Sequence, residues 1–154
     1  MELRYTGLSP EPFTALFGLD DETLAARNIR RVTADSKPGY PCRVTMQDAE
    51  PGETLLLLAY EHQPAASPYR ASGPIFVREA AGDTYDSHAV PPVFLSRQLS
   101  VRGYNDTGDI VVAGVVDGDR AEALFKQMLE REDVAYLHVH NAGRGCYAGR
   151  VDRA

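Results

Sequence analysis

Residues 119–140, DRAEALFKQMLEREDVAYLHVH, change from a helical pattern to a strand pattern within one stretch. Over residues 119–131 apolar side chains recur at spacings of three and four, which predicts a helix with one apolar face. Over residues 134–140 the alternation has a period of two, which predicts a strand, and residues 146–151 are expected to pair with it. The apolar side chains of the helix are Ala121, Leu124, Phe125, Met128 and Leu129. The chain is therefore expected to end in a helix followed by a hairpin.

Further strands are predicted before this helix. Residues 54–60, TLLLLAY, form a continuous apolar run, which is typical of a strand buried on both faces. Shorter strands are expected over residues 29–34 and 75–79. Residues 99–104 and 109–116 are predicted to form a hairpin around the turn sequence NDTG. The apolar content of 54–60 and 109–116 predicts that both strands lie in the interior of a sheet.

The first 28 residues predict two short helices. Ser9 is suited to cap the first, and Asp20 or Asp21 is suited to cap the second, over residues 22–27. This order predicts an α+β fold: a mainly antiparallel sheet with two short N-terminal helices and one longer helix before the final hairpin. With 154 residues and no linker-like segment, the chain is expected to form a single domain over residues 1–154.

The composition is that of an ordinary globular protein, with 44% hydrophobic and 25% charged residues. The 16 basic residues against 22 acidic ones give a net charge of −6, which argues against a nucleic-acid or anionic-membrane partner. The first residues form no apolar signal segment, and no apolar run is long enough for a transmembrane helix, so we expect a cytoplasmic protein. Two widely spaced cysteines, Cys42 and Cys146, do not predict a disulfide framework and are expected to be reduced. The composition gives no indication of the oligomeric state.

Three segments carry a resemblance to a known family: YPCR at residues 40–43, SPYRASGPIFVRE at residues 67–79 and HVHNAGRGC at residues 138–146. In these segments the chain resembles a bacterial family known as domain of unknown function number 1203, whose members have about this length. The resemblance implies a single-domain bacterial protein. It implies no catalytic residues, because the family has no assigned activity. Candidate sites therefore come from the residues alone.

His138 and His140 are separated by one residue, so in a strand both side chains lie on the same face, together with Tyr136. If the hairpin is centred on Gly143, His140 lies opposite Cys146. His138, His140 and Cys146 would then be candidate zinc ligands, because imidazole and thiolate both suit zinc. The alternative is that both histidines are partly buried and hydrogen-bond to neighbouring loops. A register slip of one residue would also move Cys146 to the opposite face.

Two long segments, residues 61–74 and 80–96, are predicted to be irregular, with a helical turn over residues 92–97 as the alternative. Loops of this length are often functional. The first contains His62, a candidate third metal ligand or general base, and Arg70. The second contains His88, for which a solvated loop position is the expected alternative to a site role. The sequence does not establish whether residues 61–74 pack against the final hairpin.

Arginine side chains bind carboxylates and phosphates through two parallel hydrogen bonds. An anion pocket between residues 61–74 and the final hairpin is therefore predicted, although each arginine has the alternative of ordinary surface ion pairing. The candidate ligand-binding residues are His62, Arg70, His138, His140, Arg144 and Cys146.

Three classes of function are open from the sequence. The first is a domain that binds a small anionic molecule in a pocket lined by His, Arg and Cys side chains. The second is a small enzyme that uses the same groups, with zinc as a candidate cofactor, or with Cys42 or Cys146 as a nucleophile. The third is a non-catalytic module for self-association or protein interaction. A reduced cysteine has the alternative of being a small buried hydrophobic residue.

Overall fold

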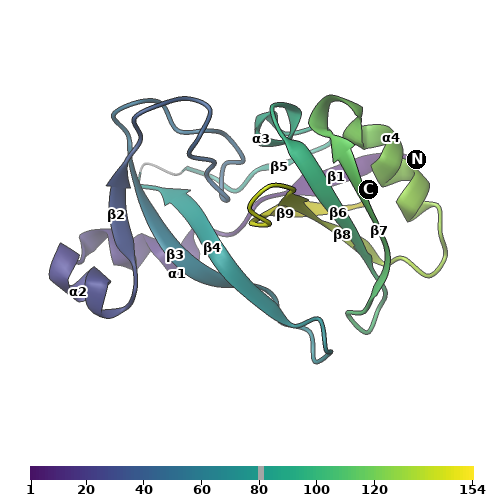
Figure 1. Ribbon diagram of the computed structural model, residues 1–154, viewed down its shortest axis with the longest axis horizontal. Helices are drawn as coiled ribbons and strands as arrows, with labels where there is room; N and C mark the ends of the chain where they lie inside the picture. Colours follow the sequence, from purple (N-terminus) through teal and green to yellow (C-terminus); the bar gives the residue numbers. More distant parts are fainter. Residues whose placement is uncertain (80–81) are drawn as a thin grey trace.

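The chain forms two antiparallel sheets that lie next to each other and meet through β4 and β9 (Figure 1). The computed structural model describes residues 1–79 and 82–154. The larger sheet has the strand order β5-β1-β9-β8-β6-β7, and the smaller sheet has the order β2-β3-β4. The strands of the larger sheet are β1 (Leu3–Thr6), β5 (Asp86–Ser87), β6 (Gln98–Tyr104), β7 (Ile110–Asp117), β8 (Tyr136–Asn141) and β9 (Tyr147–Arg153). Those of the smaller sheet are β2 (Arg30–Thr33), β3 (Thr54–Gln63) and β4 (Ala71–Arg78).

The helices are short and accompany the sheets. They are α1 (Glu11–Thr14), η1 (Ala15–Gly18), α2 (Asp21–Ala26), α3 (Pro92–Leu95), η2 (Gly118–Arg120) and α4 (Ala121–Leu129). The predicted α+β fold is thus confirmed, including two short N-terminal helices and one longer helix before the final hairpin. Across the described residues, every helix is too short or too polar to cross a membrane.

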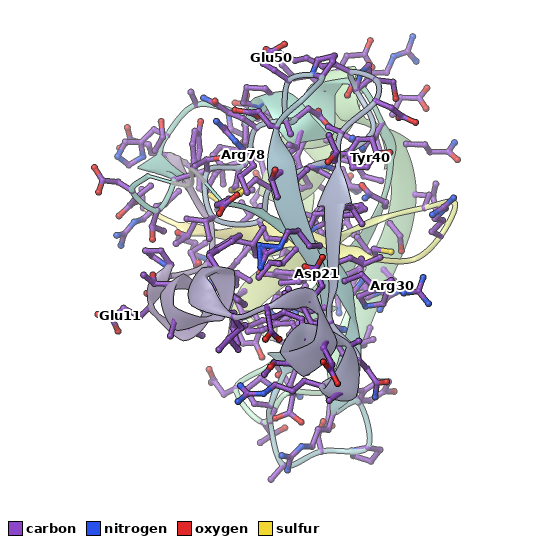
Figure 2. The ribbon with its side chains drawn as sticks, turned by 90° about the vertical axis from the view of Figure 1, so that its left-hand side faces the viewer. Glu11, Asp21, Arg30, Tyr40, Glu50 and Arg78 are labelled. Atoms are coloured by element: carbon purple, nitrogen blue, oxygen red, sulfur yellow. The ribbon has the colours of Figure 1, made fainter. Side chains whose placement is uncertain are left out.

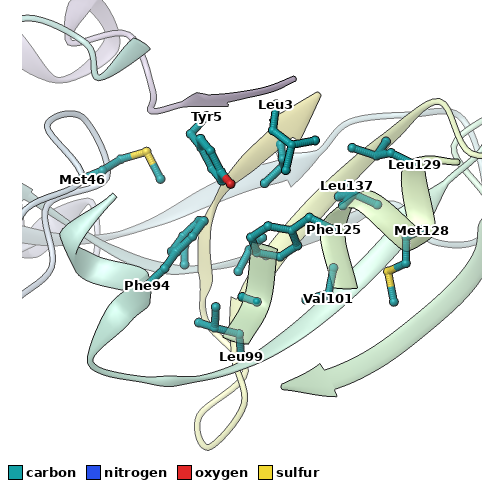
Figure 3. Packing of buried hydrophobic residues seen from close by; sticks show 14 of the residues in the cluster. Leu3, Tyr5, Met46, Phe94, Leu99, Val101, Phe125, Met128, Leu129 and Leu137 are labelled. Carbon is teal, nitrogen blue, oxygen red and sulfur yellow. The ribbon is translucent and has the colours of Figure 1, made fainter. Parts of the chain in front are cut away.

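The two faces of β8 differ in chemistry, and this difference organises the larger sheet. Leu137 and Val139 are buried on one face, which α4 covers. Phe125 of α4 packs edge-on against Tyr5 and Phe94, with ring centroids 6.1 Å apart in each pair (Figure 3). The intervening residues of β8 are polar and point to the opposite face, toward the smaller sheet. Burial of the aliphatic face therefore places the polar face between the sheets.

The N-terminal helices cover the smaller sheet on its outer side. Asp20 caps α2, because its carboxylate accepts a hydrogen bond from the Thr23 N–H at 2.7 Å. Leu24 of α2 is buried and belongs to the same cluster as Leu56 of β3. Figure 2 shows both helices in front of the sheet, with Asp21 on α2. The helices thus leave the other side of β3 and β4 free to face the larger sheet.

One of the two predicted interior strands is an edge strand. β3 lies in the middle of the smaller sheet, as predicted from residues 54–60. β7, which corresponds to residues 109–116, forms the edge of the larger sheet, and Val115 is 64% exposed. Val111, Val112 and Val116 of β7 are partly buried and pack against the core, which accounts for the apolar character of this edge strand. The prediction of an interior position for 109–116 is therefore wrong.

The sequence pattern does not predict two of the strands, because these strands are very short. β1 precedes the first helix and pairs with both β9 and β5, although the first 28 residues predict helices alone. β5 has two residues and lies inside the segment 80–96, which was predicted to be irregular. Residues 80 and 81 of that segment lie outside the described residues, and α3 occupies part of its remainder. Strands this short carry too few residues for an alternation to stand out.

Leu56 and Leu57 test the placement of β3, because they are neighbours with different surroundings. Leu56 is fully buried against the N-terminal helices, whereas Leu57 is half-buried on the opposite face. We expect Leu56→Ala to lower the free energy of unfolding by about 2–5 kcal/mol, and Leu57→Ala by no more than about 1.5 kcal/mol. Urea unfolding of the two variants measures the difference, and equal losses would contradict the assigned faces.

Candidate metal centre

Three histidines from both sheets converge where the polar face of the larger sheet meets the end of β3. They are His62 of β3 and His138 and His140 of β8, and one ring nitrogen of each lies within 4.8 Å of the other two. The ring centroid of His62 lies 4.9 Å from that of His140 and 6.2 Å from that of His138. His138 and His140 are 4% and 1% exposed, and His62 is half-buried. We call these three residues the histidine cluster.

The segment 61–74 is mostly extended at its two ends, and its first residues, which continue β3, reach the cluster. Residues 61–63 continue β3 and residues 71–74 begin β4, so only residues 64–70 connect the two strands. The prediction that all of 61–74 is irregular is therefore wrong. The extended strand carries its end across to the hairpin of β8 and β9, an adjacency that the sequence left open.

A β-bulge in β3 aims His62 at the larger sheet. The pairing of β3 with β4 shifts between Tyr60 and Gln63, so that β3 has one extra residue there. Bulges of this kind redirect side chains and often lie beside functional sites. Gln63, the next residue, also reaches the larger sheet, because its Nε2 donates a hydrogen bond to the Tyr136 hydroxyl at 2.9 Å. This hydrogen bond ties the end of β3 to β8 beside the cluster.

A second bulge, in the β8–β9 hairpin, moves Cys146 away from the histidines. The predicted pairing of His140 with Cys146 is wrong: His140 lies opposite Tyr147, and His138 lies opposite Arg150. The register shifts between Val139 and His140, which a hairpin symmetric about Gly143 does not anticipate. Cys146 is thus outside the histidine cluster. The side chain that lies beside His138 and His140 is that of His62.

One hydrogen bond fixes the orientation of His140. Its Nδ1 lies 2.8 Å from the Gly145 carbonyl oxygen, and because a carbonyl only accepts, Nδ1 carries the proton. The Nε2 of His140 therefore presents its lone pair to the cluster. Gly145 has φ +80°, a left-handed conformation that glycine adopts without strain and that positions this carbonyl. Metal-binding histidines commonly donate a hydrogen bond from the ring nitrogen that does not bind the metal, and this hydrogen bond orients the ring.

Buried ring nitrogens without hydrogen-bond partners distinguish the cluster from ordinary packing. Among the described residues, His62 Nδ1, His138 Nδ1 and His140 Nε2 are buried and unpartnered. Native proteins leave few buried polar atoms in this state, and such atoms call for a ligand, a water molecule or an ion. The alternative that the histidines are buried and hydrogen-bond to neighbouring loops is confirmed for His140 Nδ1, but it leaves one ring nitrogen of each histidine without a partner.

The cluster is held in its neutral form. Burial lowers the pKa of His138 to about 3, and the neighbouring His140 and His62 lower it further, ahead of the arginine charges. Burial also lowers the pKa of His140 to about 4, against the opposite effect of its hydrogen bond to Gly145. Burial and the positive charge of Arg102 also lower the pKa of His62. Neutral imidazole is the form that binds metal ions, so the rings need no deprotonation at neutral pH.

Tyrosines surround the three rings. Tyr147 stacks on His62, with the ring centroids 5.3 Å apart and the planes 5° from parallel. Tyr104 and Tyr136 lie 4.9 and 5.2 Å from the ring of His138. These aromatic side chains pack around the three imidazole rings. Of the three, the sequence placed only Tyr136 on the histidine face; no local pattern marks Tyr104 or Tyr147.

The other predicted site residues lie elsewhere. Arg70 forms an ion pair with Glu61 at the surface, with Nε and Oε2 3.0 Å apart. Arg144 and Cys146 line a separate cleft between the sheets. His88 follows β5 and places its Nδ1 2.8 Å from the carbonyl oxygen of Leu3. Of the six predicted ligand-binding residues, the structure brings together His62, His138 and His140. Arg70, Arg144 and Cys146 lie outside this cluster.

Comparison with known proteins gives one match. A protein-family model described as "Protein of unknown function (DUF1203)" matches residues 39–153, a span that contains the whole histidine cluster. No curated protein and no solved structure matches the chain.

The buried histidines predict a loss of stability in acid. In the unfolded chain both His138 and His140 have a pKa of about 6.5. In the folded protein the pKa of His138 is about 3 and that of His140 is about 4. The unfolded state therefore binds more protons below about pH 6.5, and the free energy of unfolding of the metal-free protein should fall from about pH 7 to about pH 4. Urea unfolding across this range measures the fall. The double variant H138Q/H140Q should show a smaller fall, and an equal one would contradict the assignment.

Proposed function

The chain belongs to the DUF1203 family of proteins of unknown function, and we propose that it binds one transition-metal ion through His62, His138 and His140. The observation that carries the proposal is the convergence of three neutral imidazoles, each of which has one buried ring nitrogen without a hydrogen-bond partner among the described residues. The cluster draws on two sheets, so it forms only when the whole chain is folded. The proposed role is thus a property of the fold rather than of one loop.

The ligand set favours an ion that prefers imidazole. Zinc is the ion we put forward, and copper, nickel and iron share this preference. A tetrahedral zinc ion with bonds of about 2.0–2.1 Å keeps its ligand atoms about 3.4 Å apart, so the three rings would move slightly closer around it. His62 is half-buried and is the most exposed of the three histidines.

Three protein ligands favour a reactive centre over a purely structural one. Structural zinc sites are usually closed by four protein ligands, whereas catalytic sites use three and keep one position for water. Among the described residues, the group that converges here contains three histidines and no fourth ligand. Zinc makes a bound water molecule acidic enough to supply hydroxide near neutral pH. A metal-dependent hydrolytic or hydration reaction is therefore the enzyme class that this proposal supports.

Arg102 favours an anionic ligand at such a centre. It lies directly opposite His138 in the pairing of β6 with β8, so both side chains share the polar face of the sheet. Its positive charge lowers the pKa of all three histidines. The same charge would stabilise hydroxide, or an anionic substrate, beside the bound ion. Arg102 is in this respect a positioning residue for the reacting anion.

Metal binding can be tested directly on the full chain. We expect the metal-free protein to take up one zinc ion per chain, measured by elemental analysis after dialysis against excess zinc and gel filtration. Cobalt in place of zinc should give the intense visible absorption of a four-coordinate site. His62→Ala and His140→Ala should each weaken zinc binding by a factor of about 100 or more, because each removes one of three protein ligands.

His88→Ala is the matched control, since His88 lies outside the cluster. It should retain one zinc ion per chain with unchanged affinity. Circular dichroism of each variant establishes that the fold is kept. Absence of stoichiometric metal in the wild-type protein, or equal binding by wild type and folded His62→Ala, would overturn the proposal.

A further inference from the structure

A cleft of about 1010 Å³ opens between the two sheets, apart from the histidine cluster. One wall comes from the smaller sheet and includes Leu57 and Phe76, and the opposite wall includes Asn141 and Cys146. None of the three clustered histidines lines the cleft. Its volume is at the upper end of the range for small-molecule sites.

Arg43 lines this cleft and is only 3% exposed. Its Nε donates a hydrogen bond to the Tyr147 carbonyl oxygen at 2.7 Å, and its Nη1 donates to the Pro41 carbonyl oxygen at 2.6 Å. Among the described residues, no carboxylate forms an ion pair with it. Burial of a charge is costly unless a counter-charge compensates it, and neutral carbonyls compensate it only in part. The guanidinium thus lacks an anion.

The cleft as a whole is positively charged, although the chain carries a net charge of −6. Three arginines line it, namely Arg43, Arg97 and Arg144, and its lining contains no Asp or Glu among the described residues. Asp48 neutralises Arg97, with Nη2 and Oδ1 2.6 Å apart. Arg43 and Arg144 form no ion pair with any carboxylate of the described residues, so the cleft presents two guanidinium groups that an anion could pair with.

We propose that this cleft binds a small organic anion whose phosphate or carboxylate group pairs with Arg43 and Arg144. An aromatic or aliphatic body would pack against Tyr40 and Phe76, whose rings lie 5.3 Å apart and both line the cleft. Guanidinium groups bind both kinds of anion through paired hydrogen bonds. The inference does not depend on the proposed metal centre, because the two sites share no side chain.

Cys146 gives a direct measure of occupancy. It lines the cleft and is half-exposed, whereas Cys42 is fully buried. N-ethylmaleimide is uncharged, so the arginines do not attract it, and it should modify Cys146 in the native protein while Cys42 reacts only after unfolding. We expect phenyl phosphate or benzoate to slow the modification of Cys146, with inorganic phosphate weaker than phenyl phosphate. Phenol, which has the same ring without the charge, should give no protection.

Variants identify the arginines responsible. Arg144→Gln lies at an exposed position and should raise the ligand concentration needed for protection, while Arg43→Met should raise it by about tenfold or more. Arg120→Gln, on η2 and outside the cleft, is the matched control and should change nothing. Should Arg43→Met not fold, Arg144→Gln alone decides. Protection that is equal for phenol and the anions, that persists unchanged in Arg144→Gln, or that no anion gives would overturn the proposal.

His62→Ala separates this inference from the proposed metal centre. The variant should lose zinc and keep anion protection of Cys146 unchanged. Stronger protection by phenyl phosphate than by benzoate identifies phosphate as the preferred head group, and the reverse order identifies carboxylate.

Discussion

The alternation of side chains along β8 is the constraint on which the rest of the structure depends. Leu137 and Val139 must be buried against α4, and in an extended strand this forces His138 and His140 to the other face. β8 lies between β9 and β6, so these imidazoles cannot turn aside at a sheet edge. A second layer must cover them, and the end of β3 supplies it. The position of the smaller sheet thus follows from the need to cover a polar strip.

Two β-bulges make that covering possible. A regular β3 would alternate its side chains between the two faces, whereas the bulge near its end lets His62 and Gln63 both contact the larger sheet. The bulge at the start of β9 places Tyr147 opposite His140, where its ring also stacks on His62. Each bulge interrupts the regular ladder of hydrogen bonds beside the packed imidazole and tyrosine rings. The irregularities therefore lie where the candidate site needs them.

Local sequence patterns predict much of the fold. The features that they do not predict depend on contacts between segments that are distant in the sequence. The apolar spacing of α4, the capping by Asp20 and the shared face of His138 and His140 each depend on a few neighbouring residues, so the sequence predicts them correctly. The edge position of β7 depends instead on which strands pair, which no local pattern encodes. His62 was a candidate ligand from its residue type, but its approach to the hairpin depends on contacts between distant segments. Arg43 and Tyr147 carry no sequence signal, because their roles come from burial and from the register that the bulge creates.

The turn from Asn141 to Tyr147 links the two candidate sites. Its Gly145 carbonyl orients His140 toward the cluster, while its Tyr147 carbonyl accepts a hydrogen bond from Arg43 in the cleft. Two backbone hydrogen bonds between Asn141 and the residues Gly145 and Cys146 close the turn, at 2.8 Å each. The two candidate sites thus border the same short, hydrogen-bonded segment of backbone, on the face of the sheet opposite the hydrophobic core that α4 covers.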